Sequence, residues 1–312
     1  MIDRREALGL LSVGGWRLAG ATGGALTACA NSDSSGGSPA QTTSPSSSPA
    51  NRQSPTANLY PIGLGTWQTF DVSDSKPLAP VLVEFVKLGG KVIDSSPMYG
   101  RSETVLGDLA TSLGIRDKLF VATKVWTSGR AEGIAQMEDS ERKLRGKVDL
   151  MQVHNLLDAD THLETLRRWK SEGRIRFIGI THYTSSAYRA LEEHLRRGGI
   201  DFLQVNYSIA EREAEKRLLP LAKDRGVRVL INRPFGAGSL FRETRGKPLP
   251  SFSKDLGATS WAELFLKFVV SHPAVTCAIP ATSKVEHLRQ NMNGGQGPMP
   301  DEAMRKRIAD AV

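Results

Sequence analysis

Residues 148–181 read VDLMQVHNLLDADTHLETLRRWKSEGRIRFIGIT and contain the pattern that decides the fold. The run Val148–His154 predicts a buried strand, Leu163–Ser171 an amphipathic helix, and Arg174–Thr181 a second strand. Gly173 lies between the helix and the second strand, where a left-handed residue commonly ends a helix. Two strands joined through one helix run parallel in the same sheet, so this segment predicts an α/β fold.

The same alternation of strand and helix extends in both directions over residues 59–312. The predicted strands are short apolar runs: Leu59–Thr66, Lys91–Ser95, Leu119–Val125, Val148–His154, Arg174–Thr181, Asp201–Asn206, Val227–Asn232 and Val275–Ile279. The predicted helices comprise Val81–Leu88, Ser102–Leu113, Ala131–Leu144, Leu163–Ser171, Ser186–Arg197, Glu213–Arg225, Ser260–Ser271, Val285–Met292 and Glu302–Ala311, with a long irregular loop over Pro234–Gly257. Eight such units in about 255 residues predict a single-domain (β/α)8 barrel, also called a TIM barrel. The competing doubly wound sheet lacks its Gly-x-Gly-x-x-Gly fingerprint.

Composition places the chain among globular proteins and narrows its partners. Hydrophobic residues make up 39% and charged residues 24% of the 312 residues, which is enough apolar material for a sizeable core. The net charge of +8 raises the question of a polyanionic partner. No basic stripe with interleaved aromatic residues is present, so no nucleic-acid site is predicted, and no spacing of His and Cys typical of a metal site occurs. Cys277 lies inside a predicted strand, where it is expected to pack as a small apolar side chain.

The first 58 residues differ in composition from the rest of the chain. Residues 1–29 predict a signal peptide of the twin-arginine type, with Arg4 and Arg5 near the start and a lipoprotein-type box that ends at Cys29. Residues 30–58 are rich in Ser and Pro and predict a flexible linker. We therefore expect an exported protein of the periplasm or cell envelope, attached to a membrane only through a lipid on Cys29. Its oligomeric state cannot be read from the sequence.

Four titratable residues fall at or just after consecutive strand ends: Asp94, Tyr99, Lys124 and His154. Reacting groups of such barrels gather on the rim formed by the carboxyl ends of the strands. A lysine buried there needs a partner, and Asp94 on the neighbouring strand predicts an ion pair with Lys124. The ammonium is expected to lower the pKa of the Tyr99 phenol and make it a better proton donor, while His154 orients a carbonyl oxygen.

Together with these residues, several longer motifs resemble the aldo-keto reductase family over essentially all of residues 59–312. The matching segments are Ile62–Trp67, Ile93–Gly100, Thr123–Lys124, Gln152–Asn155, Phe177–Thr181, Gln204–Tyr207, and Ile279–Lys284 leading to Asn291. The resemblance implies a (β/α)8 barrel that binds NADPH and passes hydride to a small-molecule aldehyde or ketone, or the reverse. It also implies that Asp94, Tyr99, Lys124 and His154 form the catalytic tetrad.

The resemblance implies a cofactor site that departs from the family pattern in places. Its residues are Thr66, Asp94, Thr181, His182, Gln204, Asn232, Arg233, Phe235, Thr282, Ser283, Lys284, His287, Gln290 and Asn291. His182 stands where the family usually has Asn, and Asn232–Arg233 stand where a Tyr commonly stacks on the nicotinamide. Lys284 favours NADPH, whereas His287 replaces a frequent Arg, so use of NADH stays open.

These observations favour an NAD(P)H-dependent oxidoreductase with Tyr99 as the general acid. The unusual cofactor residues keep one alternative open, a dinucleotide-binding or redox-sensing module with little turnover. A metal-dependent barrel hydrolase or lyase would need clustered carboxylate and His ligands, which the predicted rim lacks. The sequence does not identify the substrate or the direction of the reaction.

Overall fold

The structure, a computed structural model, describes residues 59–312. The predicted signal peptide at residues 1–29, its Arg4, Arg5 and Cys29, and the predicted linker at 30–58 lie outside the described residues. In the part that is described, no helix is both long and apolar enough to cross a membrane.

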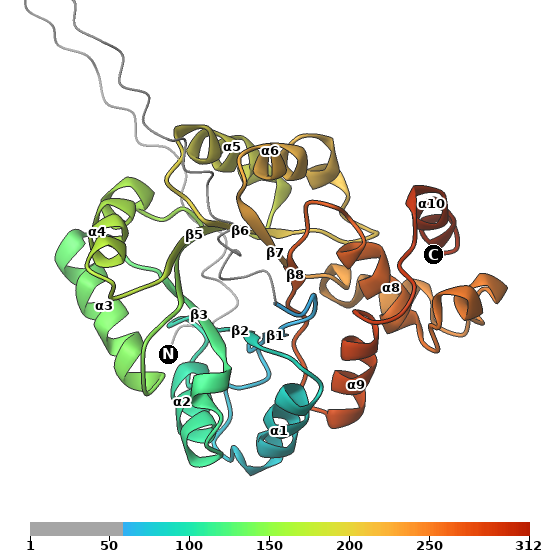
Figure 1. Cartoon of the computed structure of the whole chain (residues 1–312), viewed down its shortest axis with the longest axis horizontal. Coiled ribbons are helices and arrows are strands. Elements are labelled where there is room, and N and C mark those ends of the chain that lie inside the picture. Colours follow the sequence, from blue (N-terminus) through green and yellow to red (C-terminus); the bar gives the residue numbers. More distant parts are fainter. Residues whose placement is uncertain (1–58) are drawn as a thin grey trace, which may run out of the picture. The chain divides into compact units, whose positions relative to one another are not determined.

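Eight parallel strands follow one another around a barrel in the order of the sequence (Figure 1). They are β1 (Leu64–Gly65), β2 (Val92–Asp94), β3 (Phe120–Val125), β4 (Leu150–His154), β5 (Phe177–Thr181), β6 (Phe202–Asn206), β7 (Arg228–Asn232) and β8 (Cys277–Ala278). Parallel bridges from Ile62 to Ala278 and from Gly65 to Ala281 link the first and last strands. The predicted (β/α)8 barrel is therefore confirmed.

Helices cover the outside of the barrel (Figure 1). The α-helices are α1 (Ala79–Lys87), α2 (Ser102–Ser112), α3 (Arg130–Lys143), α4 (Ala159–Ser171), α5 (Tyr188–Arg197), α6 (Leu218–Asp224), α7 (Ser239–Glu243), α8 (Trp261–Val270), α9 (Val285–Asn293) and α10 (Glu302–Asp310). Short 3-10 helices are η1 (Lys76–Leu78), η2 (Arg116–Lys118), η3 (Ser185–Ala187), η4 (Glu213–Lys216), η5 (Gly236–Gly238) and η6 (Ser251–Leu256). After α4, Gly173 has φ 72°, as predicted for the residue that ends this helix.

One predicted helix and one predicted loop differ from the structure. The expected helix Glu213–Arg225 is split into η4 and α6 at Arg217, whose φ is −144°. Pro220 explains the break, because proline has no N–H and clashes with the carbonyl four residues earlier, so it is tolerated only in the first turn. The expected irregular loop Pro234–Gly257 contains η5, α7 and η6.

Strands β1 and β8 are only two residues long, much shorter than predicted. Pro61 precedes β1 and Pro280 follows β8 at the seam of the barrel. Neither residue has an N–H to donate, so regular pairing cannot continue through them.

The inside of the barrel is filled with apolar side chains near the amino ends of the strands. Phe120, Phe177 and Phe202 are the first residues of β3, β5 and β6, and their rings lie 5.4–5.8 Å apart. Cys277 is fully buried in the same cluster, where burial raises the pKa of its thiol. Because this end is closed by packing, the carboxyl ends of the strands are left to form a site.

Candidate active site

The four titratable residues predicted to act together meet at the carboxyl ends of β2, β3 and β4. Asp94 ends β2, Lys124 is the fifth residue of β3, and His154 ends β4. Tyr99 follows β2 in the loop before α2. The parallel register of neighbouring strands places these side chains on one rim.

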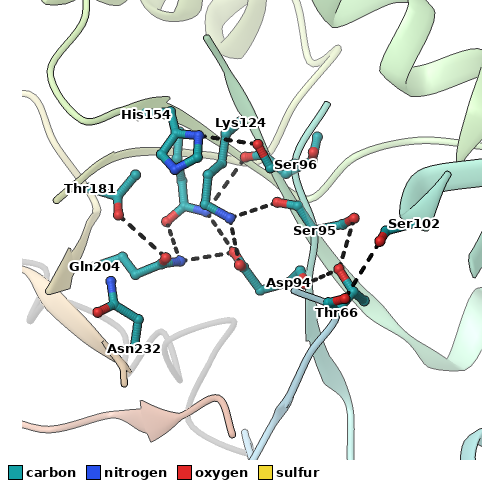
Figure 2. Close-up of polar contacts among 12 residues, drawn as sticks. Thr66, Asp94, Ser95, Ser96, Ser102, Lys124, His154, Thr181, Gln204 and Asn232 are labelled. Atoms are coloured by element: carbon teal, nitrogen blue, oxygen red, sulfur yellow. Dashed lines mark hydrogen bonds and ion pairs between the residues drawn. The ribbon is translucent and has the colours of Figure 1, made fainter. Parts of the chain in front are cut away.

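Asp94 and Lys124 form a buried ion pair at the centre of the site (Figure 2). The Lys124 ammonium lies 2.5 Å from Asp94 Oδ2 and also donates to the carbonyl of Ser95 at 2.6 Å. The other oxygen, Asp94 Oδ1, accepts from the side-chain amides of Gln152 at 3.0 Å and Gln204 at 2.8 Å. Burial is the largest single influence on the pKa of Lys124 and would lower it, but the charges and hydrogen bonds of Asp94 and Tyr99 together outweigh burial, and the net shift is upward. The predicted ion pair is therefore present, and its environment favours the charged form of Lys124.

Tyr99 lies beside this pair, with the Lys124 ammonium 4.9 Å from the centre of its ring. Burial raises the pKa of the phenol, and the opposing attraction of Lys124 is the smaller effect. The expectation that Lys124 gives Tyr99 a lowered pKa is thus wrong in its net direction, because desolvation of the phenolate dominates. At neutral pH Tyr99 carries its proton, which is the form that a general acid requires.

His154 is a neutral imidazole with a defined partner on one nitrogen. Burial, aided by the charge of Lys124, lowers its pKa to about 2. Its Nδ1 lies 3.1 Å from the hydroxyl of the buried Ser96, and the same hydroxyl accepts from the backbone N–H of Met98 at 3.4 Å. A serine hydroxyl that already accepts a hydrogen bond is suited to donate its own proton to Nδ1. The hydrogen of the ring then resides on Nε2, where it can be donated to a ligand oxygen.

Three further predicted residues line the site next to Asp94 (Figure 2). The hydroxyl of Thr181 donates to the side-chain oxygen of Gln204 at 3.3 Å. The Asn232 amide donates to the backbone carbonyl of His182 at 3.1 Å, but its own Oδ1 is buried and has no partner among residues 59–312. A buried acceptor without a donor is costly, so this oxygen fits a ligand that brings an N–H or O–H group.

The His182 ring lies just outside this group. It stacks on Tyr183 with ring centres 5.5 Å apart, and its Nδ1 accepts from the backbone N–H of Thr184 at 3.2 Å. Burial lowers the pKa of His182, which keeps the ring neutral at neutral pH. Its remaining nitrogen, Nε2, then carries the hydrogen.

Other predicted cofactor residues are engaged with the protein. The Thr66 hydroxyl lies 3.0 Å from both the Asp94 carbonyl and the Ser95 hydroxyl, which ties the ends of β1 and β2 together. The Arg233 guanidinium donates to the Tyr183 carbonyl at 3.1 Å and lies 3.7 Å from Glu211. Phe235 packs against Phe241 with ring centres 4.9 Å apart. Through these contacts, the three residues stabilise the rim of the site.

The remaining predicted residues form a second group at the start of α9. Lys284 is the residue before this helix, and the Thr282 hydroxyl accepts from its backbone N–H at 3.1 Å. Ser283, Lys284 and His287 are exposed, Gln290 is half-buried and Asn291 is buried. A helix amino end next to an exposed lysine favours an anion such as a phosphate.

Four residues of the site were not among the site residues predicted from the sequence. Gln152 and Ser96 lie within the quoted motifs, and Gln152 stands two residues before His154, hence on the same face of its strand. Trp67 and Trp126 follow the ends of β1 and β3, with ring centres 4.8 Å from Tyr99 and 6.2 Å from His154. Their position directly after predicted strand ends is the signal that points to them.

The chain matches known proteins along nearly the whole described part. A family model described as the aldo/keto reductase family matches residues 61–309. The methylglyoxal reductase YeaE of Escherichia coli is 28% identical over 243 residues, which cover 75% of this chain and 84% of that protein. An NADH-specific methylglyoxal reductase of the same organism is 27% identical, over 58% of this chain and 65% of that protein.

Solved structures share the fold as well. An aldo/keto reductase from Klebsiella pneumoniae in complex with NADP and acetate has a TM-score of 0.69 at 25% identity, covering 81% of this chain and 91% of that one. The holo form of the aldo-keto reductase AKR11C1 from Bacillus halodurans has a TM-score of 0.67 at 24% identity, covering 81% and 92%.

Proposed function

This chain belongs to the aldo/keto reductase family, and on that premise we propose that it reduces an aldehyde or ketone to an alcohol with NADPH or NADH, or catalyses the reverse reaction. The observation that carries the proposal is a protonated, half-buried Tyr99 beside the buried Asp94–Lys124 pair. The names of the relatives, two of which are methylglyoxal reductases, support a small carbonyl compound as the substrate class.

Each residue of the rim has a separate role in such a reaction. A bound nicotinamide supplies the hydride that reduces the carbonyl carbon. Tyr99 donates its proton to the carbonyl oxygen as negative charge develops there, and Lys124 stabilises the phenolate that remains. Asp94 keeps Lys124 charged and fixed in place, while His154 donates a hydrogen bond that orients the same oxygen.

The polar groups of the site fit a nicotinamide dinucleotide. The unpartnered Asn232 Oδ1 suits the N–H group of a carboxamide, with Thr181 and Gln204 beside it. At the start of α9, Ser283 and Lys284 would hold a phosphate. Lys284 favours the additional phosphate of NADPH, and the NADH-specific relative supports keeping NADH as a second cofactor.

Steady-state kinetics of the full chain test the proposal. Oxidation of NADPH and of NADH should be followed against a panel of small aldehydes and ketones that includes methylglyoxal, with the alcohol product identified. We expect substrate-dependent oxidation with NADPH preferred. Tight dinucleotide binding without turnover on any carbonyl compound would contradict the proposal and favour the redox-sensing alternative.

We also propose that the protein is exported and lipidated. The support is in the sequence: Arg4 and Arg5, the small residues before Cys29, and the Ser/Pro-rich composition of residues 30–58. Cell fractionation and labelling with a fatty acid test this directly. Arg4→Lys/Arg5→Lys should retain the protein inside the cell and Cys29→Ser should abolish the label. Export and labelling of both variants at wild-type levels would contradict the proposal.

Export through the twin-arginine route would move the barrel already folded, so we propose that it leaves the cell with its dinucleotide bound. Nucleotide analysis of the exported fraction tests this step. Close to one dinucleotide per chain is the expected result, and an exported fraction free of dinucleotide would contradict it.

A further inference from the structure

Cationic residues outnumber anionic ones in the turns at the end of the barrel opposite the active site. We call the segments that lead from a helix into the next strand the base turns; those with charged residues are 88–91, 113–119, 144–149, 172–176, 198–201 and 225–227. They hold eight cationic and four anionic residues: Lys91, Arg116, Lys118, Arg145, Lys147, Arg174, Arg176 and Arg225 against Asp117, Asp149, Glu172 and Asp201. Folding thus places several cationic residues that are far apart in the sequence at the same end of the barrel.

Two of the four acidic residues are turned toward the barrel instead of the solvent. Asp149 accepts the backbone N–H of Val121 at 2.9 Å, and its side chain is only 14% exposed. Asp201 accepts the backbone N–H of Ile178 at 2.8 Å and is 21% exposed. The two carboxylates also pair with Arg176 and Lys170, and Arg145 and Arg174 pair with acidic residues of neighbouring helices, so the unpaired charge of this end comes mainly from lysines.

Three lysines of this surface are available to an external partner. Lys91, Lys118 and Lys147 enter β2, β3 and β4 from successive base turns and are exposed. None of the three forms an ion pair with another residue between 59 and 312. Flexible lysine side chains of this kind suit a diffuse anionic surface better than a single small ligand.

The chain also reaches the barrel at this end. Leu59, the first described residue, packs against the inner cluster that contains Phe120, Phe177 and Phe202, the first residues of their strands. Residues 30–58 connect this point to Cys29. The segment that bears Cys29 is thus joined to the barrel at its base, whereas Tyr99 and the rest of the active site lie at the other ends of the strands.

We propose that the base turns dock on the anionic phospholipid headgroups of the membrane that holds the lipidated Cys29. The proposal rests on the proposed export and lipidation. Lysines near an anionic membrane surface are attracted to it, and a basic patch strengthens the hold of a lipid anchor. A nucleic acid is the less favoured polyanion, because no aromatic stacking platform accompanies these cations. Docked in this way, the barrel turns its active-site mouth away from the bilayer and toward dissolved substrates.

Vesicle flotation with the full-length Cys29→Ser chain measures membrane binding by the base turns in the absence of the lipid anchor. We expect binding to vesicles of phosphatidylcholine and phosphatidylglycerol in equal amounts at low salt, and none to pure phosphatidylcholine. Each lysine close to such a surface contributes about fivefold in affinity, so Lys91→Glu/Lys118→Glu/Lys147→Glu should weaken binding by about a hundredfold or more. Added salt should release the parent chain, since screening shortens the range of the attraction.

A matched variant separates the position of the charges from their number. Lys76, Lys254 and Lys306 are exposed lysines outside the base turns, and their change to Glu alters the net charge equally. This control should lose much less binding, and both triple variants should keep NADPH-dependent turnover. Equal loss in the two triple variants, or no loss in the base variant, would overturn the proposal. So would displacement from the vesicles by an equal phosphate concentration of duplex DNA. Turnover, measured in parallel, reports separately on the proposed enzymatic function.

Discussion

Replacing Lys124 with Met should destabilise the protein far more than the loss of an ordinary salt bridge. The Lys124 ammonium is fully buried and lies 2.5 Å from Asp94, whose side chain is 3% exposed. Met fills a similar volume but leaves the Asp94 carboxylate buried without its counter-ion. Removal of one partner of such a pair costs about 3–5 kcal/mol of the free energy of unfolding. At about 2–4 °C per kcal/mol, Tm should fall by roughly 6–20 °C.

Two further variants test whether the loss of stability is due to the burial of the ion pair. Lys170 lies 2.7 Å from Asp201 but is 40% exposed, so Lys170→Met should cost less than about 1 kcal/mol. Asp94→Asn/Lys124→Met removes both charges and should recover more than half of the loss, because the Asn oxygen still accepts from Gln152 and Gln204. Urea denaturation followed by circular dichroism gives all the values. If Lys124→Met and Lys170→Met lose equal stability, or if the double variant is less stable than the single one, the reasoning is refuted.

Three further outcomes are expected from the same structure. Ser96→Ala should lower kcat about tenfold and shift the tautomer of His154 seen by nitrogen NMR, because the hydrogen bond to Nδ1 is lost; an unchanged NMR signature would contradict that role. Lys284→Glu should weaken NADPH binding at least about tenfold and NADH binding less than about threefold, measured by fluorescence titration; equal losses would mean that Lys284 does not face the extra phosphate. In the folded protein His154 stays neutral down to about pH 2, whereas in the unfolded chain its ring takes up a proton below about pH 6.5. The contribution of His154 to the free energy of unfolding therefore falls as pH decreases through 6.5, by up to about 1.4 kcal/mol per pH unit. His154→Gln should therefore lose about 1–2 kcal/mol less than the wild type between pH 7 and 5, and identical losses would show that His154 does not cause the slope.

The barrel could be predicted because each strand and helix carries its own local pattern. Apolar runs such as Val148–His154 and glycines such as Gly173 are local signals, and they gave the order of the elements correctly. The break before α6 escaped because the apolar pattern continues across it, although Pro220 was the available sign. The shortness of β1 and β8 also escaped, although Pro61 inside the first predicted strand and Pro280 directly after the last one were the available signs.

The candidate site could be predicted only where the position of a residue on its strand determines which side chains lie next to it. Asp94 and Lys124 lie on adjacent strand ends, so their ion pair followed from the fold. The net direction of the pKa shift of Tyr99 did not, because it depends on how completely the phenol is buried. The amide network from Gln152 and Gln204 to Asp94, and the contact of Ser96 with His154, require side-chain conformations that a sequence does not state.

The most direct test of the proposed function is the turnover of Tyr99→Phe, measured beside its dinucleotide affinity. Phe keeps the ring that packs against Trp67 and removes only the hydroxyl that would donate the proton. We predict that kcat for carbonyl reduction falls by about two orders of magnitude or more, while the Kd for NADPH changes less than about threefold. A variant that turns over at the wild-type rate would contradict the assignment of Tyr99 as the general acid and, with it, the account of the site.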